Sequence, residues 1–217
     1  MNEQSSVDVA NIRRPASGLT LEREDLDDDP LRQFEAWLRD ACESEALDPN
    51  AMSVSTVDDR QRPDCRMVLL KFYDARGFVF FTNLESNKAV QISGNENVAL
   101  LFFWPTLGRQ IRIRGSAKRV PNKETLKYFV TRPRGSQIGT WVSAQSSSIS
   151  SRSLLEAKYA EIRKKFADHE VPLPSFWGGY RVTPMEIEFW QSRTNRLHDR
   201  FLYSNNEDGW NIERLAP

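Results

Sequence analysis

Short segments of alternating apolar and polar residues, bounded by turn-forming residues, recur through most of this chain. They lie at about 51–58, 65–73, 77–83, 98–104 and 109–120, and again at about 180–190, 199–204 and 210–214. The second and third are joined by Asp74-Ala75-Arg76-Gly77, which is typical of a tight turn. Alternation with a period of two is the pattern of a strand with one buried face. The sequence therefore predicts a sheet-rich protein that contains an antiparallel meander.

Helical patterns interrupt these strands. Asp29 is a plausible N-cap with Pro30 at the first helical position, and apolar residues follow at helical spacing. Ser153 with Glu156 three residues later forms a capping-box signature. Further helices are expected at about 86–93, 123–132, 136–143 and 153–168. Antiparallel strands with inserted helices indicate an α+β fold, a β-barrel with helical additions.

The length of the chain limits its domain organisation. With 217 residues it can form one domain with a sizeable core, whereas two full domains would be cramped. Residues 1–28 are polar and end in an acidic stretch, so we expect a mobile N-terminal arm. Residues 29–217 are expected to form a single domain.

Composition excludes several classes of function. Lys plus Arg equals Asp plus Glu at 30 each, so the net charge favours neither nucleic acid nor a membrane surface. Cys42 and Cys65 are too few for a disulfide framework, and no metal-ligand spacing occurs. Without a leader or a long apolar run, the protein is expected to be soluble and cytoplasmic. A basic strand leaves a nucleic-acid role as an alternative, without any recognition motif; its residues are Arg109, Arg112, Arg114, Lys118 and Arg119.

A basic run lies between two strand-like segments near the C-terminus. Arg193, Arg196 and Arg200 occur within eight residues of one another, together with His198. Arginine presents a planar fork of donors that matches a carboxylate or phosphate, and histidine changes charge near neutral pH. The run predicts a site for a planar anion, and the alternative is a solvated turn with scattered charges.

A second candidate anion site has a spacing of four residues. Tyr128 and Arg132 would share one helical face before Pro133 ends the helix. Ser136 could cap the next helix, whose N-terminal amides favour an anion. The alternative is an ordinary charged helix end followed by an ordinary cap.

A third basic set lies on the strand at 65–73 and the helix at 86–93. Arg66 and Lys71 are an odd number of residues apart, so on one strand they point to opposite faces and would serve different groups. Lys88 lies just inside the following helix. Gln110, Gln145 and the serines from Ser146 onward could read the edge of a polar heterocycle, with Trp190 over its face. A flexible serine linker and a core tryptophan are the alternatives.

Taken in order along the chain, these segments resemble the pyridoxine (pyridoxamine) 5′-phosphate oxidases. The resemblance runs from about residue 29 to the end and is carried by Arg66 to Lys71, Phe80-Phe81-Thr82-Asn83, Arg132 to Gly139, Trp177-Gly178-Gly179-Tyr180, Glu188 to Gln191, Asn195 to Arg200 and Glu213 to Pro217. It implies an FMN-binding split β-barrel that forms a homodimer with FMN at the interface. It also implies oxidation of pyridoxine or pyridoxamine 5′-phosphate to pyridoxal 5′-phosphate by O2, with H2O2 as a product and NH3 released from the amine.

The resemblance also implies roles for individual residues. FMN would be held by Arg66, Met67, Val68, Leu69, Leu70, Lys71, Phe81, Thr82, Lys88, Gln110, Gln145, Ser146, Trp190 and Arg200. The substrate phosphate would be bound by Lys71, Tyr128, Arg132 and Ser136. Arg196 and His198 would face the pyridine ring as the catalytic residues, and no metal is expected.

Two departures from the family pattern bear on binding. Asn87 stands where relatives usually carry Arg or Lys, so one charge toward the FMN phosphate is missing unless backbone donors or Arg66 compensate. Arg13-Arg14-Pro15 is not followed by the tyrosine that many relatives place over the active site. Two other functions stay open: a flavin oxidase of another ring system, as in phenazine biosynthesis, and a carrier that binds FMN or pyridoxal phosphate without turnover.

Overall fold

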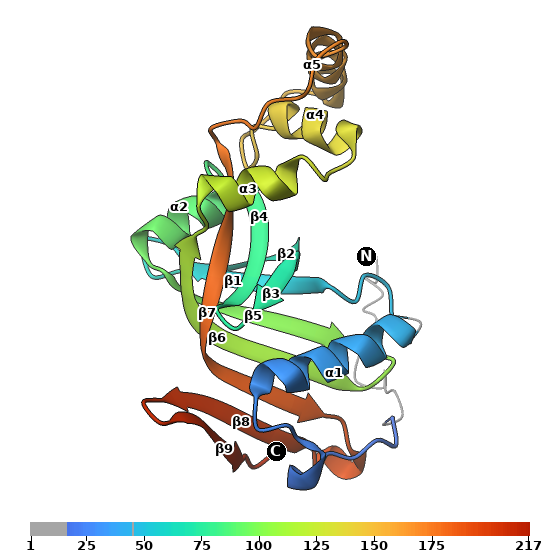
Figure 1. Ribbon diagram of the computed structural model, residues 1–217, viewed down its shortest axis with the longest axis vertical. Coiled ribbons are helices and arrows are strands. Elements are labelled where there is room, and N and C mark those ends of the chain that lie inside the picture. The colour runs from blue at the N-terminus through green and yellow to red at the C-terminus, as the bar shows by residue number, and fades with distance from the viewer. Residues whose placement is uncertain (1–16, 45) are drawn as a thin grey trace, which may run out of the picture.

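The computed structural model of the protein describes residues 17–44 and 46–217. Its strands form one curled sheet in the order β2-β1-β5-β6-β7-β4-β3, with β8 paired to β7 and β9 paired to β8 (Figure 1). The strand bounds are β1 Ala51–Val57, β2 Pro63–Leu69, β3 Phe72–Asp74, β4 Gly77–Asn83, β5 Asn97–Trp104, β6 Arg109–Arg119, β7 Trp177–Gln191, β8 Asp199–Asn206 and β9 Gly209–Arg214. The strands of the described residues pair antiparallel throughout, so the predicted antiparallel α+β fold is confirmed.

The long strand β7 divides the sheet into two halves. Its first part, Trp177 to Val182, pairs with β4, and its last part, Glu186 to Gln191, pairs with β8. Strand β6 runs along both parts, and its register shifts between Arg114 and Gly115. A bulge of this kind bends the strand that carries it. Pro184, opposite Gly115, lies between the two parts, so the two ends of β7 take part in different regions of the molecule.

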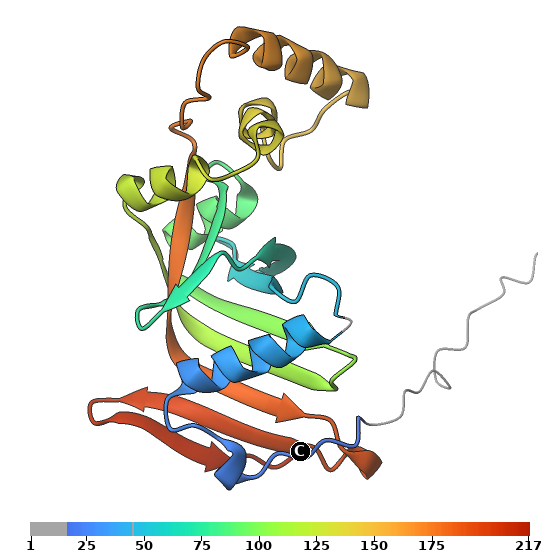
Figure 2. The same cartoon turned by 45° about the vertical axis from the view of Figure 1, so that its right-hand side comes forward.

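The helices occupy both halves. Helix α1 (Pro30–Glu43) lies over the lower part of the sheet and buries Phe34 and Trp37 against it (Figure 1). The predicted cap is confirmed, because an Asp29 carboxylate oxygen accepts the Leu31 amide at 2.9 Å. The other elements are α2 Asn87–Gly94, α3 Asn122–Phe129, α4 Arg134–Val142, α5 Arg152–Lys165 and the short 3-10 helices η1 Arg23–Asp25 and η2 Thr194–Arg196. Figure 2 shows α3, α4 and α5 gathered at the upper end, away from α1.

Two predicted helix starts were wrong. Helix α4 begins at Arg134 after Pro133, so Ser136 lies inside the first turn and does not cap it. Proline is preorganised for a helix start, which explains the earlier beginning. Helix α5 has Ser151 as its N-cap, and Ser153 lies inside the helix.

The N-terminal arm was expected to cover residues 1–28, and residues 1–16 lie outside the described part of the chain. From residue 17 the chain follows the lower sheet, where Leu21 and Leu26 belong to the main hydrophobic core. The Leu21 amide donates to the carboxylate of Asp199 at 3.1 Å. Packing therefore begins by Leu21, earlier than residue 29. None of the helices in the described part of the chain has the length and apolar character that a bilayer crossing requires.

The bend at Gly115 makes a specific prediction about stability. A Cβ atom at this position would lie 2.2 Å from the carbonyl oxygen of Thr183 on the neighbouring strand. We expect Gly115→Ala to lower the free energy of unfolding by about 2 kcal/mol, because overpacking against backbone forces the strands apart. Gly94→Ala is the control, since its Cβ would have open space within 4 Å. Urea unfolding should show a neutral or slightly stabilising effect for the control, and equal losses for both would contradict the steric argument.

Candidate functional site

A cavity of about 480 Å³ opens beside β2, β4 and the upper helices. It brings together segments that are far apart in the sequence. The residues expected to bind cofactor or substrate that line it are Met67, Val68, Leu69, Lys71, Phe81, Thr82, Lys88, Tyr128, Arg132, Ser136 and Gln145. The cavity therefore brings Lys71 and Lys88 together with Arg132, residues that the sequence placed in two separate candidate sites.

Aromatic rings form one wall of this cavity. The rings of Phe81 and Tyr128 stack with centroids 4.3 Å apart, and Phe81 stacks on Trp177 at 5.2 Å. Gly179 permits the stack, because a Cβ there would lie 2.7 Å from the Phe81 ring. Phe72 closes the edge with its ring centroid 5.5 Å from that of Tyr128. A flat apolar wall of this kind suits a planar ring ligand.

Lys88 is a buried cation at the cavity that has only neutral partners. Its residue is 6% exposed, and its ammonium donates to Thr82 Oγ1 at 3.1 Å, Ser86 Oγ at 3.3 Å and Gln145 Oε1 at 3.4 Å. Burial lowers the pKa of Lys88, and the nearby charge of Arg66 lowers it further. Among the described residues no carboxylate forms a salt bridge with it. A buried charge without a counterion is unfavourable unless an anion binds beside it.

Lys71 and Arg132 form a second cationic group at the same cavity. Burial lowers the pKa of Arg132, while burial and then the charge of Arg132 lower the pKa of Lys71. The Arg132 guanidinium donates to Thr140 Oγ1 at 2.6 Å and lies 4.7 Å from the centre of the Trp177 ring. Burial raises the pKa of the Tyr128 hydroxyl, which keeps it protonated as a donor. These groups are arranged to bind a second anion.

Tyr128 and Arg132 both line the cavity, but they do not lie on one helix as predicted. Helix α3 ends at Phe129, so Arg132 lies in the turn that follows and not on the same helical face. Pro133 restricts the residue before it to non-helical conformations, which is why the helix ends early. Lys71 likewise lies just beyond the end of β2 at Leu69, so its direction is not set by strand alternation.

Six expected FMN ligands do not line the cavity, and three of them lie in the same half of the molecule as the cavity. Arg66 lies on β2 with its guanidinium bound to Val54 O at 3.0 Å, to Thr56 Oγ1 at 2.7 Å and to the carboxylate of Asp64. Leu70 belongs to the main core. The side chain of Ser146 accepts the backbone N–H of Asn87 at 3.3 Å, and Asn87 itself is exposed. Arg66 was expected to be able to replace the charge that is missing at Asn87. Its guanidinium is instead already paired with the carboxylate of Asp64.

The remaining expected site residues lie in the other half of the molecule. Gln110, Trp190 and Arg200 are consecutive partners across β6, β7 and β8. The His198 ring packs on Trp190 with centroids 4.5 Å apart. Arg196 lies in η2, with a left-handed backbone at φ 61°.

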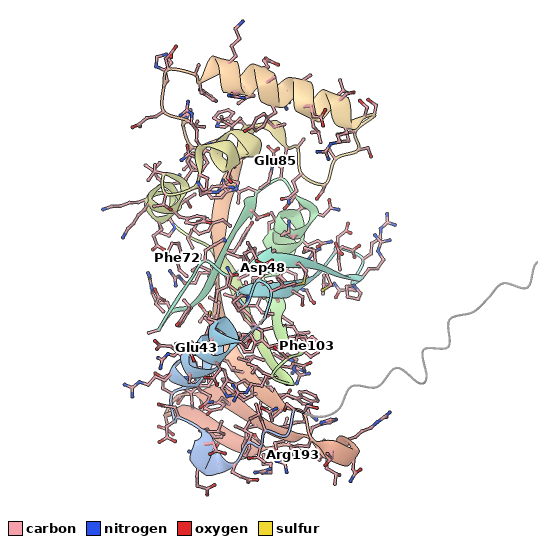
Figure 3. The ribbon with its side chains drawn as sticks, turned by 90° about the vertical axis from the view of Figure 1, so that its right-hand side faces the viewer. Glu43, Asp48, Phe72, Glu85, Phe103 and Arg193 are labelled. Carbon is pink, nitrogen blue, oxygen red and sulfur yellow. The ribbon has the colours of Figure 1, made fainter. Side chains whose placement is uncertain are left out.

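Figure 3 shows the separation of the two groups. Arg193, in the loop that carries Arg196 and His198, is labelled near the lower end, whereas Glu85, beside α2, is near the upper end. Neither Gln110 nor any residue of β7 beyond Trp177 lines the cavity. One protomer therefore carries two separate groups of the expected site residues.

Some cavity residues were not predicted individually. Asn83, Gly139, Thr140, Ser143 and Trp177 also line it. Trp177, Gly139 and Asn83 lie within the motifs that carried the resemblance, so a motif signal existed for them. Thr140 and Ser143 have no such signal, because their contribution depends on how α4 packs beside β4.

Comparison with known proteins gives a consistent result. The sequence model of a family described as pyridoxamine 5′-phosphate oxidase matches residues 38–166, and that of a pyridoxine 5′-phosphate oxidase C-terminal dimerisation region matches residues 177–217. A pyridoxine/pyridoxamine 5′-phosphate oxidase from Rippkaea orientalis is 58% identical over 212 residues, which cover 97% of this chain and 100% of that protein. One from Escherichia coli O1:K1 / APEC is 55% identical and covers 96% of both chains.

Among solved structures, PhzG from Burkholderia lata 383, in complex with tetrahydrophenazine-1-carboxylic acid, superposes with a TM-score of 0.86. It is 28% identical, and the match covers 92% of this chain and 98% of that chain. A pyridoxamine 5′-phosphate oxidase-related, FMN-binding protein from Nostoc punctiforme shares the fold at 16% identity, with a TM-score of 0.70.

Proposed function

The chain belongs to the pyridoxine/pyridoxamine 5′-phosphate oxidase family, and we propose that it is an FMN-dependent oxidase of vitamin B6 metabolism. It converts pyridoxine 5′-phosphate or pyridoxamine 5′-phosphate to pyridoxal 5′-phosphate, with O2 as the acceptor. H2O2 is a product with either substrate, and with the amine one water is also consumed and NH3 is released. The observation that carries the proposal is one cavity bordered by two separate sets of cations, Lys88 and the Lys71–Arg132 pair, beside a flat aromatic wall. We assign the protein to the cytoplasm.

The residues at the cavity fit FMN. The uncompensated ammonium of Lys88 suits its phosphate, and Gln145 and Thr82 offer polar atoms beside that charge. When bound, FMN supplies the two-electron acceptor for oxidation of the substrate's 4′ carbon and is returned to its oxidised form by O2. We propose that the expected FMN ligands that line the cavity hold it in one protomer: Met67, Val68, Leu69, Lys71, Phe81, Thr82, Lys88 and Gln145.

The second set of cations is suited to the substrate. Lys71 and Arg132 neutralise its phosphate, while Tyr128 and Ser136 add hydroxyl donors. Because the substrate is then fixed at one end, its pyridine ring can be aligned beside the flavin. Arg196 polarises the oxygen or nitrogen on the 4′ carbon, and His198 donates a hydrogen bond to the ring substituents.

A homodimer reconciles the two separate groups of residues. The matched dimerisation region, residues 177–217, contains Trp190, Arg196, His198 and Arg200. In a two-fold symmetric dimer each surface is used twice, so these residues of one protomer can complete the cavity of the other. We propose that each of the two sites draws on both protomers, with Gln110 on the same side as Trp190.

The oxidase of phenazine biosynthesis is the rival within this fold. PhzG shares 28% of its residues with this chain, against 58% for the Rippkaea orientalis oxidase. The cationic pair Lys71–Arg132 favours a phosphate-bearing substrate, because two neighbouring cations match the double negative charge of a phosphate better than the single charge of a ring carboxylate. A binding protein without turnover is the rival of another class.

An aerobic assay tests the proposal directly. Purified protein should show a flavin absorption spectrum, and pyridoxine 5′-phosphate should be converted to the aldehyde with one H2O2 released for each product. Pyridoxine, which lacks the phosphate, is the matched control and should have a kcat/KM lower by about 100-fold, since it leaves the half-buried cations Lys71 and Arg132 without an anion. A flavin spectrum without peroxide would identify a carrier, and equal rates with both compounds would overturn the phosphate assignment.

A further inference from the structure

The hairpin loop between β7 and β8 is fixed at both ends by buried polar side chains. At one end Gln191 is fully buried, and its amide donates to Leu107 O at 3.0 Å and Gly108 O at 3.2 Å while accepting from Arg109 Nε at 3.1 Å. At the other end is Asp199, its pairing partner across the two strands. The loop that carries Arg196 and His198 therefore starts and ends at rigid points.

Asp199 joins three parts of the chain. Its carboxylate accepts from the Leu21 amide at 3.1 Å, from Arg193 Nη1 at 3.3 Å and from Arg214 Nη1 at 3.1 Å. The residue is 8% exposed, so these bonds are largely shielded from water. Of the three donors, only Arg193 belongs to the loop, and its side chain ties the beginning of the loop to Asp199 at the end of the loop.

The backbone of Arg193 acts on His198. Its N–H donates to Nδ1 of the imidazole at 3.1 Å. A ring nitrogen that accepts a hydrogen bond carries no proton, so in the neutral ring the proton is on Nε2. The other side of the ring packs on Trp190. Orientation and tautomer are thus both set by contacts within one protomer.

We propose that Arg193 is a positioning residue for the oxidation. Its guanidinium, held by Asp199, keeps its own backbone N–H directed at His198 and leaves Nε2–H as the donor offered to the substrate. Asn195 and Arg196 have φ values of 58° and 61°, a left-handed conformation that requires support from the rest of the loop. This proposal rests on the proposed function only for the identity of the substrate. The geometry of the His198 imidazole does not depend on which substrate binds.

The tautomer can be measured without any turnover. The chain has two histidines, so side-chain 15N spectra of the FMN-bound protein give two sets of imidazole signals, which His198→Ala assigns. The wild type should show His198 protonated on Nε2 with Nδ1 as acceptor. Arg193→Ala should shift the signals toward a mixture of tautomers, and Arg193→Lys should restore part of the wild-type pattern. Identical spectra for the wild type and Arg193→Ala would overturn the proposal even if the protein oxidised no B6 compound.

Kinetics then distinguish positioning from a general structural role. Arg193→Ala should lower kcat for pyridoxine 5′-phosphate by roughly fivefold to tenfold with little change in KM, as expected for the loss of one well-oriented hydrogen bond. In a His198→Ala background the same substitution should change kcat by less than about twofold, because its target is absent. Equal factors in both backgrounds would overturn the proposal. Arg152→Ala, which removes an exposed ion pair on α5, is the control and should leave kcat unchanged.

Discussion

Replacing Arg196 with leucine should lower kcat/KM for pyridoxine 5′-phosphate by about 100-fold or more while FMN remains bound. A charged donor aimed at the reacting oxygen stabilises the transition state by about 3 kcal/mol in comparable sites, which corresponds to this factor. Arg196 has φ 61°, and leucine, like arginine, is unbranched at Cβ, so the substitution adds little backbone strain. The loss should therefore report the guanidinium and not the shape of the loop.

Two measurements accompany this variant. The ratio of flavin to protein absorbance should match that of the wild type, because Arg196 is assigned to the substrate. The midpoint of urea unfolding should also be unchanged, since the structure gives Arg196 no side-chain hydrogen bond or salt bridge within residues 17–44 and 46–217. Leu197→Ala, one residue away and 67% exposed, is the matched control. Turnover near that of the wild type in Arg196→Leu would remove this residue from the mechanism.

Local sequence patterns were sufficient to predict most elements of the fold, but the single strand expected at 65–73 is two strands, β2 and β3. The pair Asp29-Pro30 marked the start of α1, and the turn ending in Gly77 marked the start of β4, because both depend on the chemistry of neighbouring residues. The starts of α4 and α5 were misplaced, because a serine caps a helix only where the chain enters it. The chain enters these helices at Pro133 and Ser151, before the serines Ser136 and Ser153 that were expected to cap them. The order of strands in the sheet, with β7 shared by both halves, depends on long-range packing and has no local signal.

The candidate site was predictable in its residues and not in its arrangement. Motifs that match the family identified Lys71, Arg132 and Lys88, and the structure gathers all three at one cavity. Strand alternation could not show that Arg66 pairs with Asp64, since a side-chain partner depends on rotamers. Nor could any pattern in a single chain show that Arg196 lies apart from that cavity. Such a separation is a property of the folded protomer, and we propose that the dimer overcomes it.

A complementation experiment tests how the separation is overcome. Arg132→Leu should on its own raise KM for pyridoxine 5′-phosphate by about 10- to 100-fold, because it removes a half-buried charge assigned to the phosphate. Arg196→Leu should lower kcat/KM by a different route, because it removes the group that polarises the reacting atom. If each site combines Arg132 of one protomer with Arg196 of the other, a heterodimer of the two variants contains one intact site and one site with both defects.

The heterodimer can be isolated by placing a different affinity tag on each variant and purifying through both. Its kcat should then be about half that of the wild type with a wild-type KM, since one of two symmetric sites is restored. Both parent homodimers should remain nearly inactive at the same low substrate concentration, which makes the recovery easy to detect. Sites formed within single protomers would give the opposite result, because every site in the heterodimer would then retain one of the two defects. Restoration would thus show that Lys71 and Arg132 work with the partner protomer's loop, and its absence would rule out a shared site.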